Sequence, residues 1–510
     1  MSKTGSYVVR TMGCKANLHD SQKIEAELQR RGWRPAAEAF AGEAELCIVN
    51  SCTVTDEADR QSRRLAARLS RENPAARVVV TGCSAEVDPE RLASSKGIHY
   101  VIGNRDKPAL VELILQKLEN PGPEAGAETR GEVLGRASGY EEMLSRHPMD
   151  REWSLPDRAE WSATGPESGG EARQTRTTRA FIKIQDGCNS FCTYCVIPYG
   201  RGPSRSLRPR ELVEQVRQLV AAGVREVVLT GTNIGDYGSD WGPEPELAPA
   251  THAGKPALPA LVELLELIFA ETDLERLRLS SLDPTEVGMP GLIELMEREP
   301  RFCPHFHVSL QSPHSRILRL MKRRYGFDEV RRCLERIAAI RRPGDAGTGQ
   351  GEPVYVGMDV ITGFPGESDA EFEWGVERLK ELPWTRLHVF PYSERAGTPA
   401  TRLPGTVPQS VRVERARRLQ ALSLERARSH AEKALKRYQA QSSIISHILG
   451  EARSDSGTYG YTPGYLRVCV KSPEGKPVGE SLRNELLTAR PVRMESEAAS
   501  GEAWIVAELV

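Results

Sequence analysis

A short segment near the middle of the chain contains three cysteines, Cys188, Cys192 and Cys195, in a C-x3-C-x2-C spacing with Tyr194 before the last. Three thiolates on one tight loop can bind three irons of a [4Fe–4S] cluster and leave the fourth iron open to a small molecule. An open coordination position is typical of a catalytic site rather than a structural one. The alternative is structural zinc, but such sites pair C-x2-4-C with a second ligand pair, and none follows here. The spacing therefore predicts a catalytic iron–sulfur centre with these cysteines as its ligands.

The bulk composition is that of an ordinary globular protein. The chain has 510 residues, 39% of them hydrophobic and 27% charged, and is long enough for about three domains. It contains no run of about 18 apolar residues and no apolar N-terminal segment, so we expect neither a membrane span nor a signal peptide. Ten cysteines without a secretory signal favour metal or cluster ligation in a reducing cytoplasm over a disulfide framework.

Residues 1–118 alternate short β-branched runs with helical stretches, which is typical of an open parallel α/β sheet. The strands are predicted over residues 7–11, 46–50, 78–81 and 100–102, and helices over 18–31 and 58–71.

A cysteine lies at or just beyond the end of each of the first three predicted strands: Cys14, Cys52 and Cys83. Since the carboxyl ends of parallel strands share one edge of a sheet, these three thiols can meet at one point. They predict a second three-cysteine cluster site, and the alternative is three small buried residues. We expect the remaining cysteines to be core residues: Cys47, Cys303, Cys333 and Cys469.

The rest of the chain predicts a linker and two further domains. Residues 119–177 are rich in Gly, Glu, Pro, Ser and Arg without periodicity, which indicates a flexible linker. Residues 178–437 carry six repeats of strand then helix, which favour an incomplete (β/α)6 barrel with a trailing basic helix, and the Cys188 loop follows its first strand, where function gathers in barrels. Residues 438–510 alternate apolar and polar side chains between Gly-rich turns, which predicts a small β-barrel.

Two segments of the barrel region are basic. Residues 313–342 contain ten Lys or Arg against three Asp or Glu, and residues 411–437 contain nine against three. A basic helix is often only a solvated face, but two of them make a phosphate-binding surface plausible although the net charge is −1.

The combination of these parts resembles the radical S-adenosylmethionine (SAM) methylthiotransferase family, in which an N-terminal cluster domain precedes a radical SAM barrel and a C-terminal TRAM domain. The resemblance covers most of the chain outside the linker. The matching motifs, beside the Cys188 loop, are Gly13-Cys14-Lys15-Ala16-Asn17, Cys52-Thr53-Val54-Thr55, Thr81-Gly82-Cys83, Ile197-Pro198-Tyr199-Gly200-Arg201-Gly202, Gly363-Phe364-Pro365-Gly366-Glu367 and His388-Val389-Phe390-Pro391-Tyr392-Ser393. Gly-Cys-Lys-x-Asn followed by Cys-Thr-Val-Thr is similar to the threonylcarbamoyladenosine tRNA subtype.

The resemblance implies a tRNA-modifying enzyme that adds a methylthio group to C2 of N6-threonylcarbamoyladenosine at position 37, with two [4Fe–4S] clusters and SAM as cofactors. The Cys14–Cys52–Cys83 cluster would carry sulfur, one SAM would methylate it, and a second SAM at the Cys188 loop would yield the radical. Because the target C–H is not acidic, radical abstraction suits it better than a general base. Both clusters would then face one cavity between the first two domains.

The resemblance also implies roles for further residues. Tyr194 would lie near the SAM adenine, the Gly231-Thr232-Asn233 loop near the SAM amino group, and Gly363 and Pro365 would let backbone approach the cofactor. For Tyr194 and the Gly363 turn, packing is the alternative. Arg201 and Arg205 would bind a carboxylate or phosphate or lie on the surface. For His305 and His307, a core role is the simpler reading.

The implied partners are the anticodon arm of tRNA and an electron donor that the sequence does not specify. Alternatives remain open at this point: modification of isopentenyladenosine tRNA or of a ribosomal protein, or a non-catalytic RNA-binding redox sensor.

Overall fold

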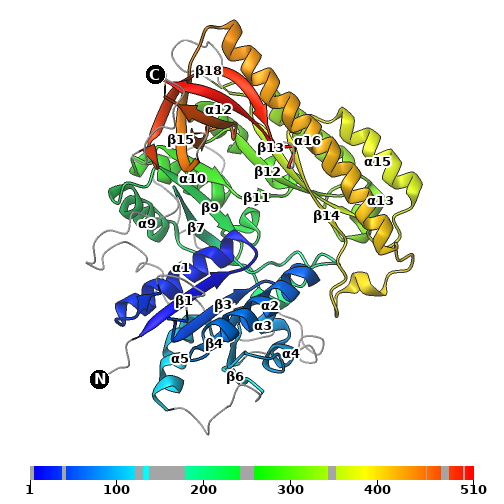
Figure 1. Cartoon of the computed structure of the whole chain (residues 1–510). Coiled ribbons are helices and arrows are strands. Elements are labelled where there is room, and N and C mark those ends of the chain that lie inside the picture. The colour runs from blue at the N-terminus through cyan, green and yellow to red at the C-terminus, as the bar shows by residue number, and fades with distance from the viewer. Residues whose placement is uncertain are drawn as a thin grey trace.

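The structure of the chain, a computed structural model, has three parts arranged along one axis (Figure 1). An N-terminal α/β sheet lies at one end, a half-barrel in the middle and a small β-barrel at the other end. The residues that the structure describes are 5–36, 42–120, 130–136, 178–241, 258–342, 352–454, 457–472, 482–497 and 500–510. No helix within these ranges is long and apolar enough to cross a bilayer.

The N-terminal part is a six-stranded, fully parallel sheet in the order β2-β1-β3-β4-β5-β6. Its strands are β1 (Ser6–Thr11), β2 (Arg34–Pro35), β3 (Leu46–Ser51), β4 (Arg77–Gly82), β5 (Tyr100–Ile102) and β6 (Glu132–Leu134). Its helices are α1 (Lys15–Arg30), α2 (Asp56–Glu72), α3 (Cys83–Val87), α4 (Pro89–Ala93), α5 (Leu110–Glu119) and the 3₁₀ turn η1 (Lys107–Ala109).

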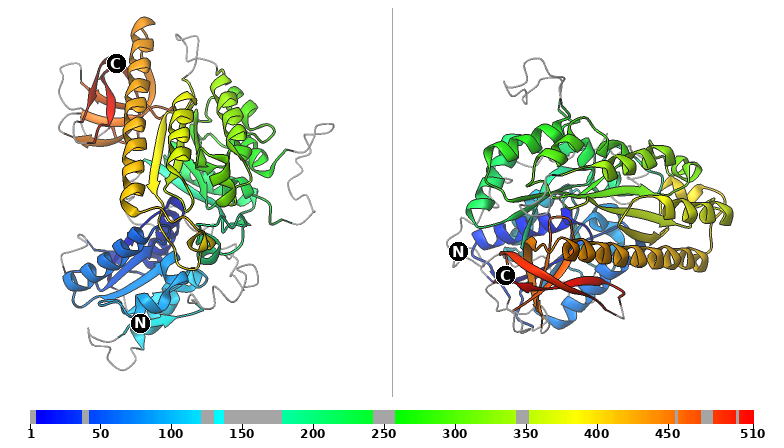
Figure 2. Two further views of the ribbon diagram at one scale, coloured as in Figure 1. Left: turned by 90° about the vertical axis from the view of Figure 1, so that its right-hand side faces the viewer. Right: turned by 90° about the horizontal axis from the view of Figure 1, so that it is seen from above.

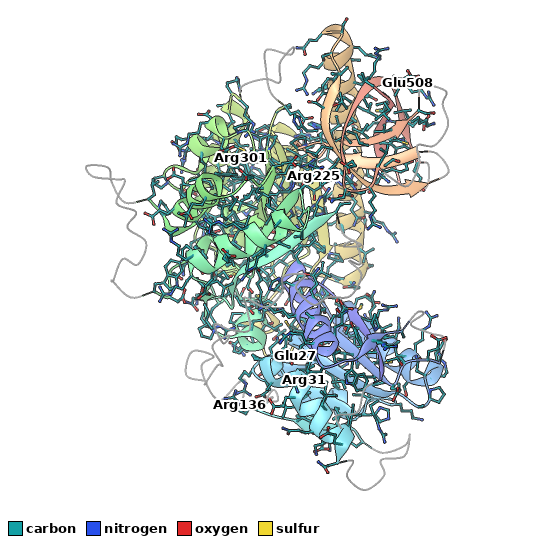
Figure 3. All side chains as sticks on the ribbon, turned by 90° about the vertical axis from the view of Figure 1, so that its left-hand side faces the viewer. Glu27, Arg31, Arg136, Arg225, Arg301 and Glu508 are labelled. Atoms are coloured by element: carbon teal, nitrogen blue, oxygen red, sulfur yellow. The ribbon has the colours of Figure 1, made fainter. Side chains whose placement is uncertain are left out.

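Local sequence explains the elements that position the first cysteines. Strand β3 is buried on both faces, as a central parallel strand must be, and its run Leu-Cys-Ile-Val-Asn-Ser is apolar until the last two residues. Helix α2 begins because the Thr55 hydroxyl accepts the Ala58 N–H at 3.1 Å, and acidic residues fill its first turn. The outer face of α1 carries ordinary exposed ion pairs such as Glu27–Arg31 at 2.6 Å (Figure 3).

The half-barrel is built from parallel strands β7, β9, β10, β11, β12, β13 and β14, and the short β8 pairs antiparallel to β7. These strands are β7 (Arg179–Asp186), β8 (Arg205–Ser206), β9 (Glu226–Gly231), β10 (Arg276–Leu279), β11 (Ser281–Leu282), β12 (His305–Gln311), β13 (Tyr355–Thr362) and β14 (Arg386–Pro391). The helices are α8 (Ile197–Arg201), α9 (Pro209–Ala221), α10 (Ala260–Glu271), α11 (Pro284–Val287), α12 (Leu292–Arg298), α13 (Ser315–Leu320), α14 (Phe327–Ala339), α15 (Asp369–Glu381) and α16 (Gln409–Ala440), with 3₁₀ turns η3 (Ile234–Asp236) and η4 (Pro399–Arg402).

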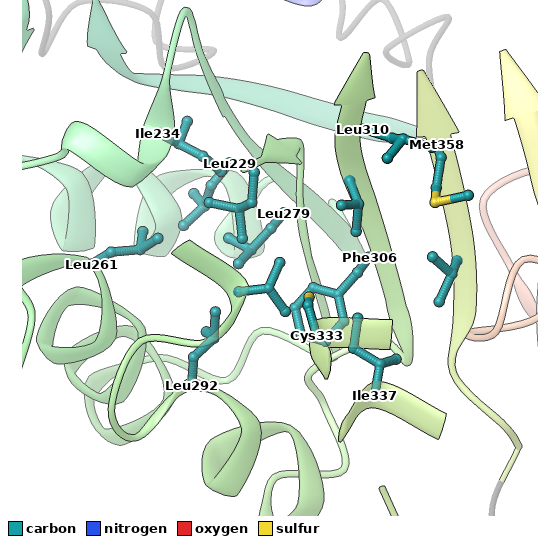
Figure 4. Close-up of a cluster of buried hydrophobic side chains, with 14 of the residues drawn as sticks. Leu229, Ile234, Leu261, Leu279, Leu292, Phe306, Leu310, Cys333, Ile337 and Met358 are labelled. Atoms are coloured by element: carbon teal, nitrogen blue, oxygen red, sulfur yellow. The ribbon is translucent and has the colours of Figure 1, made fainter. Parts of the chain in front are cut away.

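The core of this part lies between the strands and the helices that cover their outer face. Leu229, Leu279 and Phe306 from three strands pack with Leu261 and Leu292 from α10 and α12 (Figure 4). Because alternate strand residues face this core, the residues between them face the inside of the half-barrel. That inner face is where a ligand of a barrel fold is expected.

The C-terminal part is a closed β-barrel in the order β15-β16-β17-β19-β18. Its strands are β15 (Ile445–Ser454), β16 (Gly457–Tyr461), β17 (Arg467–Lys471), β18 (Leu486–Ser496) and β19 (Ala503–Leu509). The long helix α16 runs along the half-barrel beside β14 and leads into this barrel (Figure 2). Ala431, Ala434 and Tyr438 near its end belong to the core of the small barrel.

The predicted fold class is confirmed: an open parallel sheet, an incomplete barrel with six strand positions and a small β-barrel. Every strand predicted for the first sheet is present, and all six strand positions of the barrel are present, the third divided between β10 and β11. One strand lies where the sequence predicts a linker, because β6 extends the first sheet beside β5. It has only three residues and gives no periodic signal. Residues 121–129 and 137–177 of that range lie outside the described residues.

A buried charge cluster joins the half-barrel to the small barrel. The Glu226 carboxylate lies 2.6 Å from Arg276, 3.0 Å from Arg179 and 3.0 Å from Arg278. Arg276 donates to the carbonyl oxygen of His447 at 2.9 Å, so the guanidinium that Glu226 orients also holds the small barrel. Burial alone would raise the pKa of Glu226, but the three guanidinium groups outweigh it and lower this pKa to about 2.

We expect Glu226→Gln to destabilise the junction strongly. The substitution keeps the side chain's shape but leaves three guanidinium groups without their buried counter-charge, which costs on the order of 3–5 kcal/mol. Urea denaturation measures the free energy of unfolding. The control is Glu275→Gln, which removes the half-exposed partner of Arg225 (Figure 3) and costs about 1 kcal/mol or less. Equal losses in the two variants would contradict this account of the junction.

Candidate functional site

The Cys188 loop follows β7 directly and is shaped by its own backbone. Gly187 has a φ of +75°, and a Cβ there would collide with the carbonyl oxygen of Pro203, so only glycine fits the turn out of the strand. The Cys188 N–H donates to the Gly202 carbonyl at 3.0 Å, and the Cys195 N–H donates to the Cys192 carbonyl at 3.0 Å. These hydrogen bonds close the loop on itself.

Each sulfur of this loop accepts a hydrogen bond. The Ser190 N–H donates to Cys188 Sγ at 3.4 Å, and the Ile197 N–H donates to Cys195 Sγ at 3.4 Å. Arg323 donates to Cys192 Sγ at 3.1 Å. Burial raises the pKa of the Cys188 and Cys195 thiols, which opposes ionisation. Donors aimed at the sulfurs favour the thiolate form that iron binds.

The second cysteine set lies at one edge of the N-terminal sheet, as the sequence predicts. Cys52 follows β3 and Cys83 follows β4, whose ends are in register at Ser51 and Gly82. Cys14 is the N-cap of α1, after β1. Gly13 has a φ of +88°, and a Cβ there would lie 2.5 Å from Cys52 Sγ.

These three thiols are brought together. Burial, assisted by the neighbouring Cys83 and Cys14 thiols, raises the pKa of Cys52 to about 12. Cys14 is exposed, whereas Cys52 and Cys83 are buried. The four cysteines predicted as core residues are buried elsewhere: Cys47, Cys303, Cys333 and Cys469.

The two cysteine sets meet at the junction of the first two parts. Helix α3 begins with Cys83 and packs against α8, which begins two residues after Cys195. The side-chain amide of Asn104 links them: it donates to Cys83 Sγ at 3.5 Å and to the Gly200 carbonyl of α8 at 2.6 Å. A Cβ on Gly200 would lie 3.4 Å from that of Cys83.

A buried network of charged side chains holds this junction. The Asp20 carboxylate on α1 accepts from Lys183 of β7 at 2.5 Å, from Lys107 at 3.0 Å and from Arg201 of α8 at 3.3 Å. Asp186, at the end of β7, accepts from Arg201 and from Lys183 at 2.8 Å each. Arg201 also donates to the Asn17 side chain. Its guanidinium, which is 2% exposed, is therefore shared by both parts rather than offered to a phosphate.

The network keeps both carboxyl groups ionised. Burial alone would raise the pKa of Asp20, but Lys107, Lys183 and Arg201 outweigh it and lower this pKa well below its usual value. Asp186 behaves in the same way, with Arg201 as the largest opposing influence. Asp20 pairs across the junction with Lys183 and Arg201, so separating the two parts would break these buried ion pairs.

The loop predicted to meet the SAM amino group is fixed to the Cys188 loop. The N–H groups of Thr232 and Asn233 donate to the Gln185 side-chain oxygen at 3.0 and 2.9 Å, and the Thr232 hydroxyl donates to Asp186 at 3.2 Å. Gly231 approaches the Gln185 carbonyl so closely that a Cβ there would lie 2.7 Å from it.

The remaining predicted cofactor residues lie at the same ends of the strands. Tyr194 packs edge-on against Phe364 with ring centroids 6.3 Å apart, so packing accounts for part of its role. Gly363 and Pro365 belong to the turn after β13, where the Gly363 N–H donates to Glu367 at 2.7 Å and Arg412 of α16 lies over the glycine. The turn is therefore also a packing contact for α16.

The inner face of the half-barrel carries a polar row. His307 Nε2 lies 2.9 Å from Asp359, and the His307 ring stacks on His388 with centroids 5.1 Å apart. His388 is exposed on this face, and so is Phe390. His305 is buried between Tyr355 and a tyrosine of the small barrel, which agrees with a core role.

Two functional contacts have no signal in the sequence. Asn104 lies far from both cysteine sets along the chain, and Arg323 belongs to the basic segment 313–342 that predicts a phosphate-binding surface. Arg323 instead points inward to Cys192 and forms an ion pair with Asp283. In the second basic segment, Arg412 and Arg415 are buried in ion pairs at 2.7 and 2.5 Å. These three arginines are not available to RNA phosphates, which is a correction to the expected surface.

The donor sets suit iron–sulfur clusters better than single metal ions. Among the described residues, no group of three His, Cys, Asp or Glu side chains is arranged to hold one metal ion. A [4Fe–4S] cluster asks for a wider arrangement, because each thiolate binds a different iron. Two sets of three thiols, with hydrogen-bond donors at four of the sulfurs and a glycine that leaves room beside Cys52, fit that demand.

Comparisons with known proteins agree with this geometry. Residues 182–379 match the radical SAM superfamily, and residues 6–103 match the uncharacterized protein family UPF0004. The chain is 32% identical to the threonylcarbamoyladenosine tRNA methylthiotransferase MtaB of Bacillus subtilis over 94% of this chain and 93% of that protein. It is 33% identical to the protein of the same name from Aquifex aeolicus, over 83% and 89%.

A more distant relative and a solved structure mark the limits of this similarity. The chain is 30% identical to a tRNA-2-methylthio-N(6)-dimethylallyladenosine synthase of Mycolicibacterium paratuberculosis over 90% of this chain and 78% of that protein. The structure of the radical SAM methyltransferase TsrM from Kitasatospora setae is similar in fold, with a TM-score of 0.50 over 78% and 75% and an identity of 16%.

We expect Asp20→Asn to loosen the junction between the two cysteine sets. The change leaves Lys183, Lys107 and Arg201 short of one buried negative charge, at a cost on the order of 3–5 kcal/mol. The midpoint temperature of thermal unfolding would fall, and limited proteolysis would release the N-terminal part at a lower temperature than in the parent. Glu27→Gln on the exposed face of the same helix is the matched control and costs about 1 kcal/mol or less. A wild-type proteolysis profile for Asp20→Asn would show that the network does not hold the junction.

Proposed function

The chain belongs to the radical SAM methylthiotransferases that modify tRNA, and on this premise we propose that it adds a methylthio group to C2 of N6-threonylcarbamoyladenosine at position 37. The proposal includes the cofactor ligands. Cys188, Cys192 and Cys195 would bind the [4Fe–4S] cluster that works with SAM, and Cys14, Cys52 and Cys83 would bind the second [4Fe–4S] cluster.

One observation carries the proposal: the two cysteine sets come from different parts of the chain and meet at one junction. Asn104 touches Cys83 on one side and α8, which follows the Cys188 loop, on the other. A reaction that moves sulfur from one centre to a carbon activated at another needs the two centres side by side. A radical SAM enzyme with one cluster would need only the Cys188 loop.

With its cluster and SAM bound, the site supplies an electron and a carbon radical able to abstract an aromatic hydrogen. The chain's own residues position the cofactor. Thr232 and Asn233 are held beside the Cys188 loop by Gln185, ready to meet the amino group of SAM. Tyr194 would lie near its adenine, and Gly363 would let the backbone approach the cofactor. Arg323 holds a positive charge beside Cys192, which stabilises the thiolate.

We divide the chain accordingly. Residues 1–118 are the cluster domain, 119–177 the linker, 178–437 the radical SAM barrel with its trailing helix, and 438–510 the TRAM domain. The anticodon arm is the part of tRNA that carries position 37 and so is the partner we propose, together with a separate electron donor. We place the reaction in the cytoplasm, where tRNA is modified.

A second candidate substrate is N6-dimethylallyladenosine in tRNA, because the chain is also 30% identical to a synthase of its methylthio derivative. The match to the Bacillus subtilis threonylcarbamoyl enzyme covers 93% of that protein, against 78% of this synthase, which favours the first substrate.

The ligand assignment predicts the iron content of the anaerobically prepared protein. The parent should contain about eight irons per chain, and a variant with Cys14, Cys52 and Cys83 changed to alanine about four, since one cluster is lost. That variant should still cleave SAM, whereas a Cys188, Cys192 and Cys195 variant should not. Cys303→Ala and Cys333→Ala, at buried cysteines outside both sets, should keep the parent value. About four irons per chain in the parent would contradict the assignment of two clusters.

The substrate assignment is tested by nucleoside mass spectrometry. A bacterial host that lacks its own enzyme should gain 2-methylthio-N6-threonylcarbamoyladenosine in tRNA when it expresses this chain, and not when it expresses Cys188→Ala. Cys303→Ala is the control that keeps the product. Methylthio-dimethylallyladenosine as the only product would select the second substrate, and no methylthio nucleoside at all would contradict both.

A further inference from the structure

Lys15 presents a positive charge toward the inside of the half-barrel. It is the first residue of α1, next to Cys14, and α1 packs against β7. Its ammonium lies 5.7 Å from the centroid of the Phe181 ring of β7. The groups that interact with it electrostatically come from across the half-barrel. The strongest are the like-charged Arg278 and Arg179, followed by Glu226 and Asp359, and His388 on the polar row of the inner face also feels its charge. Lys15 therefore faces the space bounded by that row.

Lys15 differs from the other cations near the junction. Lys183 and Arg201 are buried and bound to Asp20 and Asp186, and Arg278 is buried against Glu226. The Lys15 side chain is exposed, and within the described ranges its ammonium makes neither an ion pair nor a hydrogen bond. A cation that is held in place but not neutralised is available to an anionic ligand.

The acidic neighbour on the inner face does not compete for this role. Asp359 lies 2.9 Å from His307, on the strand beside it, so its charge is directed to the imidazole. His307 is covered in turn by His388. Glu226, the other carboxylate that interacts with Lys15, is shared by three arginines. The charges that surround Lys15 thus leave its ammonium without a partner of its own.

The proposed substrate brings an anion to this place. In N6-threonylcarbamoyladenosine the substituent on N6 ends in a carboxylate and a hydroxyl group. Only N1 separates C2, the atom to be modified, from C6, the atom that bears N6. A residue next to Cys14, in the set proposed to hold the sulfur-bearing cluster, is therefore close to the N6 substituent whenever C2 is close to that cluster.

We propose that Lys15 binds the carboxylate of the threonylcarbamoyl group and so selects this substrate over adenosines with a neutral N6 substituent. The inference rests on the proposed function and names the residue that recognises its substrate. Exposed His388 and Phe390 on β14 form the wall along which the rest of the substituent lies. A dimethylallyl group has no charge to offer, so its binding would cover the Lys15 ammonium without giving it a partner.

The test compares two synthetic anticodon stem-loop RNAs that differ only in charge. One carries N6-threonylcarbamoyladenosine at position 37, and the other carries its carboxamide, which has the same shape and no charge. Fluorescence anisotropy with anaerobically prepared protein gives both dissociation constants. We expect the parent to bind the carboxylate RNA about tenfold tighter or more, as for a hydrogen bond to a charged group.

Lys15→Gln should abolish this preference by weakening only the carboxylate RNA, and Lys15→Arg should retain most of it. Lys23→Gln, two turns further along α1, is the matched control and should keep the parent ratio. Because Lys15 follows Cys14, the iron content of each variant is measured in parallel, and the ratio of the two constants is compared only at parent iron content.

The outcomes separate this inference from the function on which it rests. A Lys15→Gln protein that keeps the parent ratio, or that weakens both RNAs equally as a phosphate contact would, overturns the role of Lys15. A parent that methylthiolates the threonylcarbamoyl RNA but shows no preference for the carboxylate overturns it as well and leaves the proposed function intact. A parent that methylthiolates only dimethylallyladenosine RNA overturns the function itself.

Discussion

The salt-bridge network around Asp20, Arg201 and Asp186 is the interaction on which the rest of the structure depends. It joins α1 of the N-terminal sheet to β7 and α8 of the half-barrel, and it lies beside both cysteine sets. Asp20 from the N-terminal part pairs with Lys183 and Arg201 of the half-barrel, and these buried ion pairs form only when the two parts are docked. Buried ions without partners are costly, so a docking geometry that breaks these ion pairs is strongly disfavoured. The same contact sets the spacing of the two proposed clusters.

The proposed function depends on this junction because it brings the two cysteine sets together. The Cys188 loop is closed by its own hydrogen bonds and fixed by Gln185 and Asp186 to the loop proposed to meet SAM. The second cysteine set is fixed by the parallel ends of β1, β3 and β4. Neither set alone defines a methylthiotransferase. Docked through α3 and α8, they would form the proposed site in which a carbon radical and a sulfur donor reach the same purine. The small barrel is locked to the opposite ends of the strands through Glu226 and its arginines.

Much of the fold could be predicted because short-range sequence patterns indicate its strands and helices. Parallel strands appear in the sequence as β-branched runs. A cysteine after each of three such runs predicts that the three side chains share the carboxyl edge of the sheet, and Cys14, Cys52 and Cys83 do lie there. The contacts that dock the parts could not be predicted, because they join residues far apart in sequence whose types have ordinary surface uses. Arg323 in a basic run and Asn104 in a loop are examples, and both turn toward cysteine sulfurs. The short β6 has too few residues to show a period.

The central claim is that two iron–sulfur centres, one per cysteine set, lie together at the junction of α3 and α8. The most direct test is an anomalous difference map from crystals of the anaerobically prepared protein, measured at the iron absorption edge. The account predicts two iron peaks on either side of Asn104, one bounded by Cys14, Cys52 and Cys83 and the other by Cys188, Cys192 and Cys195. A single peak, or two peaks on separate faces with protein packed between them, would contradict it.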